Sequence, residues 1–325
     1  MKVAWFDRWA INLGLCVLGI QVAAAQTYPI KPITLVVGYT AGGSVDLAAR
    51  TVAGELGKRL GQTVVVENVG GAGGALGAQK VVSAASDGYT LLLGTSAEIA
   101  VGKLVSPNTR YDGLVDLQAL GLLGTQPMML VASSGVNASD TVSVIDAIRK
   151  LPGTFSYGSA GNASLPHLAG ELFKTLTKTD IVHVPYKGAA PMITDLLGNQ
   201  IQLGMLVFSS ALPHVRAGKL RAIAVTEPTR SEQLPNVPAL SETKELTGFD
   251  LSVFFGLFSR TGTSAAVASR IAEAMFETMK QPDVRAKLTE AGFTVRALDA
   301  AASAKFIAQQ AKTYREIVEQ SKIRE

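Results

Sequence analysis

Hydrophobic and polar positions follow two different periods near the start of this chain. Ile33 to Val37 is a short apolar run rich in β-branched residues, which is typical of a buried strand. Beginning at Val45, apolar residues recur at the spacing of one helix face, at Ala48, Ala49, Val52, Leu56 and Leu60. A glycine-containing turn, Gly38 to Ser44, joins the two patterns. The sequence therefore predicts a strand, a tight turn and a helix.

The turn between this strand and this helix is suited to an anion. Gly42 and Gly43 permit positive φ and carry no Cβ that would obstruct a ligand, and Ser44 is able to cap the helix. The free N–H groups of the helix start and the helix dipole then point into the turn. We interpret Asp46, in the first helical turn, as a residue that complements the dipole; a catalytic acid is the alternative.

Two further strands also lead into small residues. Val64 to Glu67 is followed by the glycine-rich run Asn68 to Gly77 and by a helix over Ala75 to Ala84. The strand Tyr89 to Leu93 ends at Gly94-Thr95-Ser96. Three such strands predict a parallel sheet whose carboxyl edge carries a site. The glycine run fails the G-x-G-x-x-G spacing of dinucleotide-binding proteins, so no nucleotide is expected there.

The middle of the chain repeats this architecture. A strand beginning at Phe155 leads into the small polar loop Ser159 to Ser164, and the next helix has Pro166 in its first turn. Two such loops facing each other would form a cleft lined by hydroxyl and N–H groups. Pro127 to Ala132, which follows a predicted strand at Leu120 to Leu123, is a candidate crossing between two domains. Further segments with strand or helix patterns are Val142–Lys150 (helix), Ile181–Val184 (strand), Ala190–Leu197 (helix), Ile201–Phe208 (strand), Ala211–Ala217 (helix), Leu220–Thr226 (strand), Leu251–Ser259 (a second crossing strand), Ala265–Lys280, Pro282–Ala291 and Asp299–Ser321 (helices).

Composition adds two limits to this picture. The 325 residues, 47% of them hydrophobic, are enough for two domains with separate cores. The formal net charge is +4, and the lysines and arginines are scattered rather than clustered with aromatic residues. Nucleic acid is therefore not an expected partner, whereas the basic balance weakly favours acidic small molecules.

Residues 1–25 have the pattern of a secretory signal peptide. A positive start with Lys2 and Arg8 precedes the apolar segment Ala10 to Val22 and a small-residue cleavage site at Ala23 to Ala25. This pattern predicts export to the periplasm. Cys16, the only cysteine, falls inside the segment; a lipid anchor there is the alternative, which the bulky Leu15 disfavours. The mature chain would contain no cysteine for disulfides, thiolate catalysis or metal binding.

The histidines do not have the spacing of a metal site or a catalytic triad. His167, His183 and His214 lie on separate elements without an H-x-x-x-H or H-E-x-x-H pattern, so no metal is expected. Ser164 and His167 are close in sequence, but no G-x-S-x-G occurs, and an exported hydrolase that uses them is kept only as an alternative function. We interpret His167 as a packing or hydrogen-bonding residue, with ligand contact as the alternative.

Six segments carry a resemblance to a known family, in the family's order along most of the mature chain. They are Tyr39–Asp46, Gly71–Gly74 with Gly77, Asp87–Leu92, Tyr157–Asn162 with Pro166–Phe173, His183–Gly188 and Pro213–Ala222. With these segments the chain resembles the Bug family, the extracytoplasmic solute receptors of tripartite tricarboxylate transporters.

The resemblance implies an α/β protein with the type II periplasmic-binding-protein fold, in which two α/β domains are joined by two crossing strands and the ligand lies in the cleft between them. We expect domain 1 to comprise 26–126 and 248–325, and domain 2 to comprise 127–247. Members of the family bind small carboxylates through backbone N–H groups, hydroxyls and bridging waters. The resemblance thus implies a monomeric periplasmic receptor, not an enzyme, that needs no cofactor and delivers a carboxylate to the membrane subunits of a transporter. A receptor that serves a signalling partner instead of a transporter is the other alternative.

The expected ligand-binding residues come from the two facing loops, the end of the third strand and the cleft rim. They are Tyr39, Thr40, Ala41, Gly42, Gly43, Ser44, Thr95, Ser96, Ser159, Ala160, Gly161, Asn162, Ser164, His167 and Tyr186. For Tyr186, a plain strand-to-helix turn is an equally good interpretation. Leu206 stands where many family members carry an acid, and the absence of that acid weakens the case for an amino acid as ligand.

Overall fold

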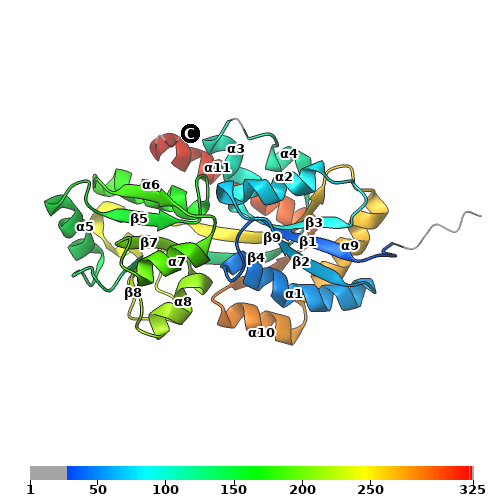
Figure 1. The fold of residues 1–325 in the computed structure, drawn as a ribbon. Coiled ribbons are helices and arrows are strands. Elements are labelled where there is room, and N and C mark those ends of the chain that lie inside the picture. The colour runs from blue at the N-terminus through cyan, green and yellow to red at the C-terminus, as the bar shows by residue number, and fades with distance from the viewer. Residues whose placement is uncertain (1–27, 108, 322, 324–325) are drawn as a thin grey trace, which may run out of the picture.

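The computed structural model describes residues 28–107, 109–321 and 323, and shows two lobes connected by shared strands (Figure 1). The predicted signal peptide and Cys16 lie outside the described residues. No helix within these residues has the length and apolar character needed to cross a membrane. The two lobes share a ten-stranded sheet, whose main path runs in the order β2-β1-β3-β9-β4-β7-β5-β6.

The first lobe is built on a parallel sheet, as predicted. β1 (Ile33–Val37) lies between β2 (Val64–Asn68) and β3 (Thr90–Thr95) and pairs with both in parallel. β1 is almost fully buried because helices cover both faces of the sheet. On one face, α1 packs with α9 and α10; on the other lie α2 and α11 (Figure 1). The bounds of these helices are α1 Ser44–Leu60, α2 Ala75–Ser83, α9 Ala265–Met279, α10 Pro282–Glu290 and α11 Ala300–Ser321.

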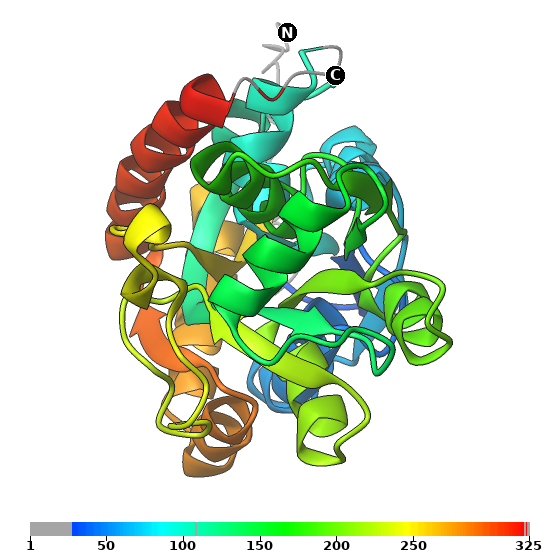
Figure 2. The same ribbon diagram turned by 90° about the vertical axis from the view of Figure 1, so that its left-hand side faces the viewer.

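The second lobe repeats this arrangement with a shorter sheet. β5 (Ser156–Ser159) pairs in parallel with β6 (Val182–Pro185) and β7 (Leu203–Val207), so the carboxyl ends of these strands meet at one edge. Figure 2 looks onto this lobe from the side on which α5 lies in Figure 1. The remaining elements of the second lobe are β8 Arg221–Val225, α5 Thr141–Lys150, α6 Leu165–Thr177, α7 Ala189–Leu197 and α8 Phe208–Arg216.

Two long strands connect the lobes. β4 (Leu117–Ala132) pairs with β9 (Ser252–Arg260) as far as Pro127 and with β7 from Met128 onward, so one strand belongs to both lobes. The prediction of two separate strands, Leu120–Leu123 and Pro127–Ala132, is therefore wrong. The intervening residues 124–126 looked like a break in the pattern, but they continue the ladder with β9 and are buried. The prediction of a crossing strand at Leu251–Ser259 is confirmed.

The C-terminal region holds a strand that the sequence pattern did not predict. β10 (Thr294–Leu298) pairs antiparallel with β4, although its side chains are only partly buried and Arg296 interrupts the apolar pattern. α11 follows and packs against both β4 and α6, so it contacts both lobes along one side of the molecule (Figures 1 and 2). Short helical turns complete the fold: η1 Ala72–Gly74, η2 Ala97–Val101, α3 Gly102–Val105, α4 Gly113–Asp116, η3 Leu240–Glu242 and η4 Lys244–Leu246.

Candidate functional site

A narrow cavity lies between the lobes, at the carboxyl ends of β1, β3, β5 and β7. Its volume is small: about 30 Å³ is wide enough for the centre of a water molecule. The first lobe contributes the turn before α1 and the end of β3, and the second lobe contributes the start of α6, α7 and the end of β7. The lining residues are Tyr39, Gly43, Ser44, Val45, Thr95, Ala160, Leu165, Pro166, Ala189, Met192, Met205, Leu206, Val207, Ser210 and Val253.

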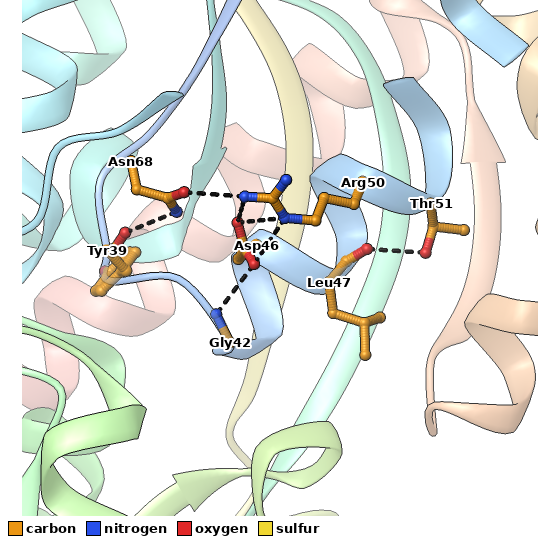
Figure 3. Close-up of polar contacts among 7 residues, drawn as sticks. All are labelled: Tyr39, Gly42, Asp46, Leu47, Arg50, Thr51 and Asn68. Atoms are coloured by element: carbon orange, nitrogen blue, oxygen red, sulfur yellow. Dashed lines mark hydrogen bonds and ion pairs between the residues drawn. The ribbon is translucent and has the colours of Figure 1, made fainter. Parts of the chain in front are cut away.

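The β1–α1 turn is held in place by a buried carboxylate (Figure 3). Gly42 has φ +83° and donates its N–H to Asp46 Oδ2 at 3.0 Å, which closes the turn. Arg50 binds Asp46 in turn and also contacts Asn68, whose amide donates to Tyr39 O at 3.0 Å. Burial raises the pKa of Asp46, but the hydrogen bonds from Arg50 and from Gly42 N–H outweigh it, so the net pKa is lowered. Asp46 is thus an ionised anchor of the turn, which agrees with its interpretation as a non-catalytic residue.

The start of α1 faces the second lobe. The expectation that Ser44 caps this helix is wrong, because the turn ends one residue earlier: Gly43, at φ −88°, is the N-cap and offers no side-chain acceptor. Ser44 is the first helical residue, and its backbone N–H donates to Ser210 Oγ at 3.1 Å. Ser210 lies in the first turn of α8, so this hydrogen bond joins the two lobes at the wall of the cavity.

The end of β3 rests on a buried acid. Thr95 donates both its N–H and its hydroxyl to Glu98 Oε2. Tyr39, at the end of β1, donates its hydroxyl to Gly73 O at 2.7 Å. Burial raises the pKa of Glu98 to about 7, although the hydrogen bonds from Thr95 act in the opposite direction. In the described part of the chain, Glu98 Oε1 is buried without a hydrogen-bond partner. Ser96 does not line the cavity; its hydroxyl accepts from Phe254 N–H of β9.

Two stacked histidines support the loop of the second lobe. His183 Nε2 lies 2.7 Å from Ser159 Oγ, and its ring stacks on His167 with 4.1 Å between the centroids. Ser164 caps α6 by accepting from His167 N–H, and His167 Nδ1 accepts from Ala163 N–H. His167 thus packs against His183 and accepts a hydrogen bond from Ala163 N–H, and its contact with a ligand stays a prediction. Burial lowers the pKa of both histidines to about 4, so they are neutral at pH 7.

These contacts give no support to a hydrolase. Ser164 Oγ contacts the backbone nitrogen of His167 rather than its imidazole. A histidine whose pKa is about 4 is also a weak general base near neutral pH. Among the described residues, no group of three or more His, Cys, Asp or Glu is placed to hold a metal ion.

Glycines bring the two lobes into direct contact beside the cavity. A Cβ at Gly73 of the first lobe would lie 2.1 Å from Asn162 O of the second, and a Cβ at Gly161 would lie 2.9 Å from Gly73 N. A Cβ at Gly188 would lie 2.5 Å from Thr40 Oγ1. These approaches leave no room for a side chain, so the structure is a closed form in which the lobes touch.

The expected site residues fall into two groups. Those that line the cavity are Tyr39, Gly43, Ser44, Thr95 and Ala160. Those that do not line it are Thr40, Ala41, Gly42, Ser96, Ser159, Gly161, Asn162, Ser164, His167 and Tyr186. Of this second group, Gly161, Asn162 and Tyr186 border another gap between the lobes, together with Arg110 and Lys187.

Sequence reasoning missed most of the second-lobe wall. The missed lining residues are Val45, Leu165, Pro166, Ala189, Met192, Met205, Val207, Ser210 and Val253. Leu206 was noticed only through the family resemblance, and it lies in this wall with 1% of its surface exposed. An apolar wall carries no signal that distinguishes it from the core. One sequence feature could have pointed to Ser210: Ser209 and Ser210 follow β7 at the start of a helix and so repeat the pattern of a strand, small polar residues and a helix that marks the other loops.

The geometry can now be compared with known proteins. Residues 48–323 match the family described as tripartite tricarboxylate transporter family receptor. The chain belongs to this receptor family. Protein BugT of Bordetella pertussis is 36% identical over 262 residues, which cover 78% of this chain and 80% of BugT. Family members are periplasmic receptors, and this receptor has their two-domain α/β fold, as predicted.

Two solved structures relate the cleft to ligands. MatC from Rhodopseudomonas palustris with bound malate has a TM-score of 0.86 and 28% identity, covering 90% of this receptor and 100% of MatC. An R. palustris protein with adipate has a TM-score of 0.86 and 27% identity, covering 91% of this receptor and 99% of that chain. Both relatives were solved with carboxylates.

Proposed function

We propose that this receptor binds a small carboxylate in the cavity between its lobes. The observation that carries the proposal is the start of α1, where the Ser44 N–H points at the second lobe and finds only a serine hydroxyl. A carboxylate could replace that hydroxyl and would also meet the favourable end of the helix dipole. The carboxylates in the two R. palustris relatives support the choice of ligand class.

The proposed binding needs no arginine clamp. A hydrogen bond to a charged group contributes about 1.5–3 kcal/mol, and micromolar affinity corresponds to about 8 kcal/mol. Several neutral donors are therefore sufficient. We propose that Tyr39, Ser44 and Thr95 contact the ligand directly and that Gly43 and Ala160 form part of the wall. Thr40 to Gly42, Ser96, the rest of the loop Ser159–Ser164, His167 and Tyr186 would hold these lining residues in place.

The proposal also covers the molecule as a whole. We propose domain 1 as 26–126 and 248–325 and domain 2 as 127–247, because β4 changes partner between Pro127 and Met128. The receptor would be exported by residues 1–25, act as a monomer without catalytic turnover, and close on the ligand before docking on the membrane subunits of its transporter.

A thermal-shift screen of carboxylates tests this function. A ligand that binds only the folded receptor stabilises it by about 2.7 kcal/mol at a hundredfold excess over the dissociation constant. We expect carboxylates without an amino group to give larger shifts than aspartate or glutamate, because a desolvated ammonium needs an acidic partner and no acid in the described part of the chain lines the cavity. If no carboxylate raises the melting temperature, the proposed function is wrong.

A further inference from the structure

The cavity has two chemically different sides. Its hydrogen-bonding side chains are Tyr39, Ser44 and Thr95 from the first lobe and Ser210, which contacts Ser44. The rest of the second-lobe wall is apolar and comes from the start of α6, from α7 and from β7. This apolar wall consists of Ala160, Leu165, Pro166, Ala189, Met192, Met205, Leu206 and Val207.

Among the residues that the structure describes, no charged side chain lines the cavity, although charged groups lie near it. Asp46 is paired with Arg50 behind the β1–α1 turn. Glu98 lies behind Thr95, which donates both its N–H and its hydroxyl to this carboxyl group. Arg110 and Lys187 border the other gap between the lobes rather than this cavity. The Ser44 N–H and the Ser210 hydroxyl can therefore bind one carboxylate, but a second one would lie against methionine, leucine and valine side chains at a high desolvation cost.

We infer that the physiological ligand is a monocarboxylate with a compact apolar body, either aliphatic or aromatic. This inference rests on the proposed function and adds the chemistry of the rest of the ligand. The carboxylate binds at the Ser44 N–H and the Ser210 hydroxyl, and the apolar body packs on Met192, Met205 and Leu206. Methionine side chains are unbranched and adaptable, so two of them allow the wall to fit aliphatic or aromatic shapes.

Matched ligand pairs test the inference on the unaltered protein. Isothermal titration calorimetry would compare pentanoate with glutarate and benzoate with terephthalate, so that each pair differs by one carboxylate on a similar skeleton. We expect the monocarboxylate of each pair to bind at least tenfold more tightly. Equal or tighter binding of the dicarboxylates would overturn the inference and leave the proposed function standing. Binding of neither class would overturn both.

A pair of isosteric variants tests the role of the apolar wall. Met192→Gln introduces an amide of similar shape into the wall, and Met129→Gln makes the same change in the same apolar cluster but outside the cavity. Both methionines are fully buried, so the two variants carry a similar folding cost. We expect Met192→Gln to weaken monocarboxylate binding at least tenfold and Met129→Gln to leave it within twofold. Equal effects on binding would contradict the placement of the ligand, and circular dichroism checks that both variants fold.

Discussion

Two carboxyl groups next to the same turn have opposite electrostatic environments. Asp46 accepts hydrogen bonds from Arg50 and from Gly42 N–H, and the pKa of this carboxyl is lowered. Glu98 is buried, which raises its pKa to about 7, and no ion pair to it is found within the described residues. The first group stays ionised and holds the turn, whereas the second is about half protonated at pH 7. Sequence position alone does not separate them, since both are acids close to the end of a strand.

The Glu98→Gln variant should change how stability depends on pH. In the unfolded chain this carboxyl ionises near pH 4.5, but in the folded receptor only near pH 7. The folded state therefore binds more protons between these values, and its free energy of unfolding falls as the pH rises through this window. Glutamine does not ionise, so the variant lacks this loss of stability. We expect the free energy of unfolding of Glu98→Gln, minus that of the wild type, to be about 1–3 kcal/mol larger at pH 8 than at pH 4.5. Urea unfolding at both pH values measures this, and an equal difference at both would contradict the assignment.

Gly43 tests the cavity itself. Its φ of −88° suits any residue, and a Cβ would make only ordinary contacts, at 3.7 Å from Thr40 O and 3.8 Å from Ala189 Cβ. A larger side chain would enter the cavity, so we expect Gly43→Leu to abolish ligand binding and to leave the fold intact. Gly54→Leu, on the exposed face of α1 with open space around it, is the control. Unchanged affinity of Gly43→Leu by calorimetry would refute the placement of the ligand.

At the scale of elements, the site depends on how the β1–α1 turn is fastened. The turn presents Ser44 N–H to the cavity, and Asp46 fixes it through Gly42 and Arg50 (Figure 3). The strand and the helix on either side follow directly from their apolar periods. The contacts that hold the turn do not follow from local sequence, because Asn68 comes from the end of the next strand and meets the turn only in the folded sheet.

Removing the Asp46 side chain should affect both stability and binding. We expect Asp46→Ala to lower the free energy of unfolding by about 1–3 kcal/mol, because Gly42 N–H and Arg50 lose their partner. Ligand affinity should fall as well, since the turn no longer holds Ser44 in place. Glu55→Ala removes another ion pair of α1, to Arg59, without touching the turn, and should cost at most about 0.5 kcal/mol. If the two variants have the same affinity for ligand, the fastening role is wrong.

Elements whose own residues carry an apolar period could be predicted from the sequence, whereas elements held by pairing with distant strands could not. β1, α1 and α6 were predicted because their own residues carry a clear period. β4 was split in two because Gly124 to Gln126 looked like a loop, whereas the pairing with β9 keeps this segment extended. β10 was missed because its five residues are held by hydrogen bonds to β4 rather than by an apolar face.

The same distinction applies to the site. The sequence could place the two loops at the sheet edge because strand ends in a parallel sheet share one edge, but of the second loop only Ala160 lines the cavity. The apolar wall was not predicted, because Met192 and Met205 have the same pattern as core residues, and only the packing of the lobes leaves them beside a cavity. Ser210 was not predicted as the partner of Ser44, since 166 residues separate the two and no local pattern connects them.

At the scale of the whole molecule, closure depends on a contact between backbones. Gly73 and Asn162 approach so closely that a single methyl group does not fit between them. Because backbone meets backbone at this point, the closed form fixes the distance between the loop that holds Gly73 and the loop that holds Asn162. The lobes meet again where Thr40 N–H donates to Lys187 O at 3.4 Å.

A methyl group at Gly73 should oppose closure. Its Cβ would lie 2.1 Å from Asn162 O, so we expect Gly73→Ala to weaken ligand binding at least tenfold and to give a larger radius of gyration with ligand by small-angle X-ray scattering. Gly61→Ala is the control, because Gly61 also has positive φ (+75°, against +60° for Gly73) but has open space around it. Both variants should lose about 1 kcal/mol of stability from the backbone conformation. Wild-type affinity in Gly73→Ala would show that this contact does not limit closure.

The path of the chain through β4 and β9 also has a consequence for protein engineering. Pro127 and Ser252 are partners in the β4–β9 ladder, so the chain leaves the first lobe and returns to it at neighbouring positions. The whole second lobe is therefore a single insert whose two ends lie side by side, an arrangement that tolerates transplantation. Exchanging this insert between relatives would combine the carboxylate donors of one receptor with the apolar wall of another. Chimeras cut at these two positions offer a direct way to build receptors with new ligand preferences.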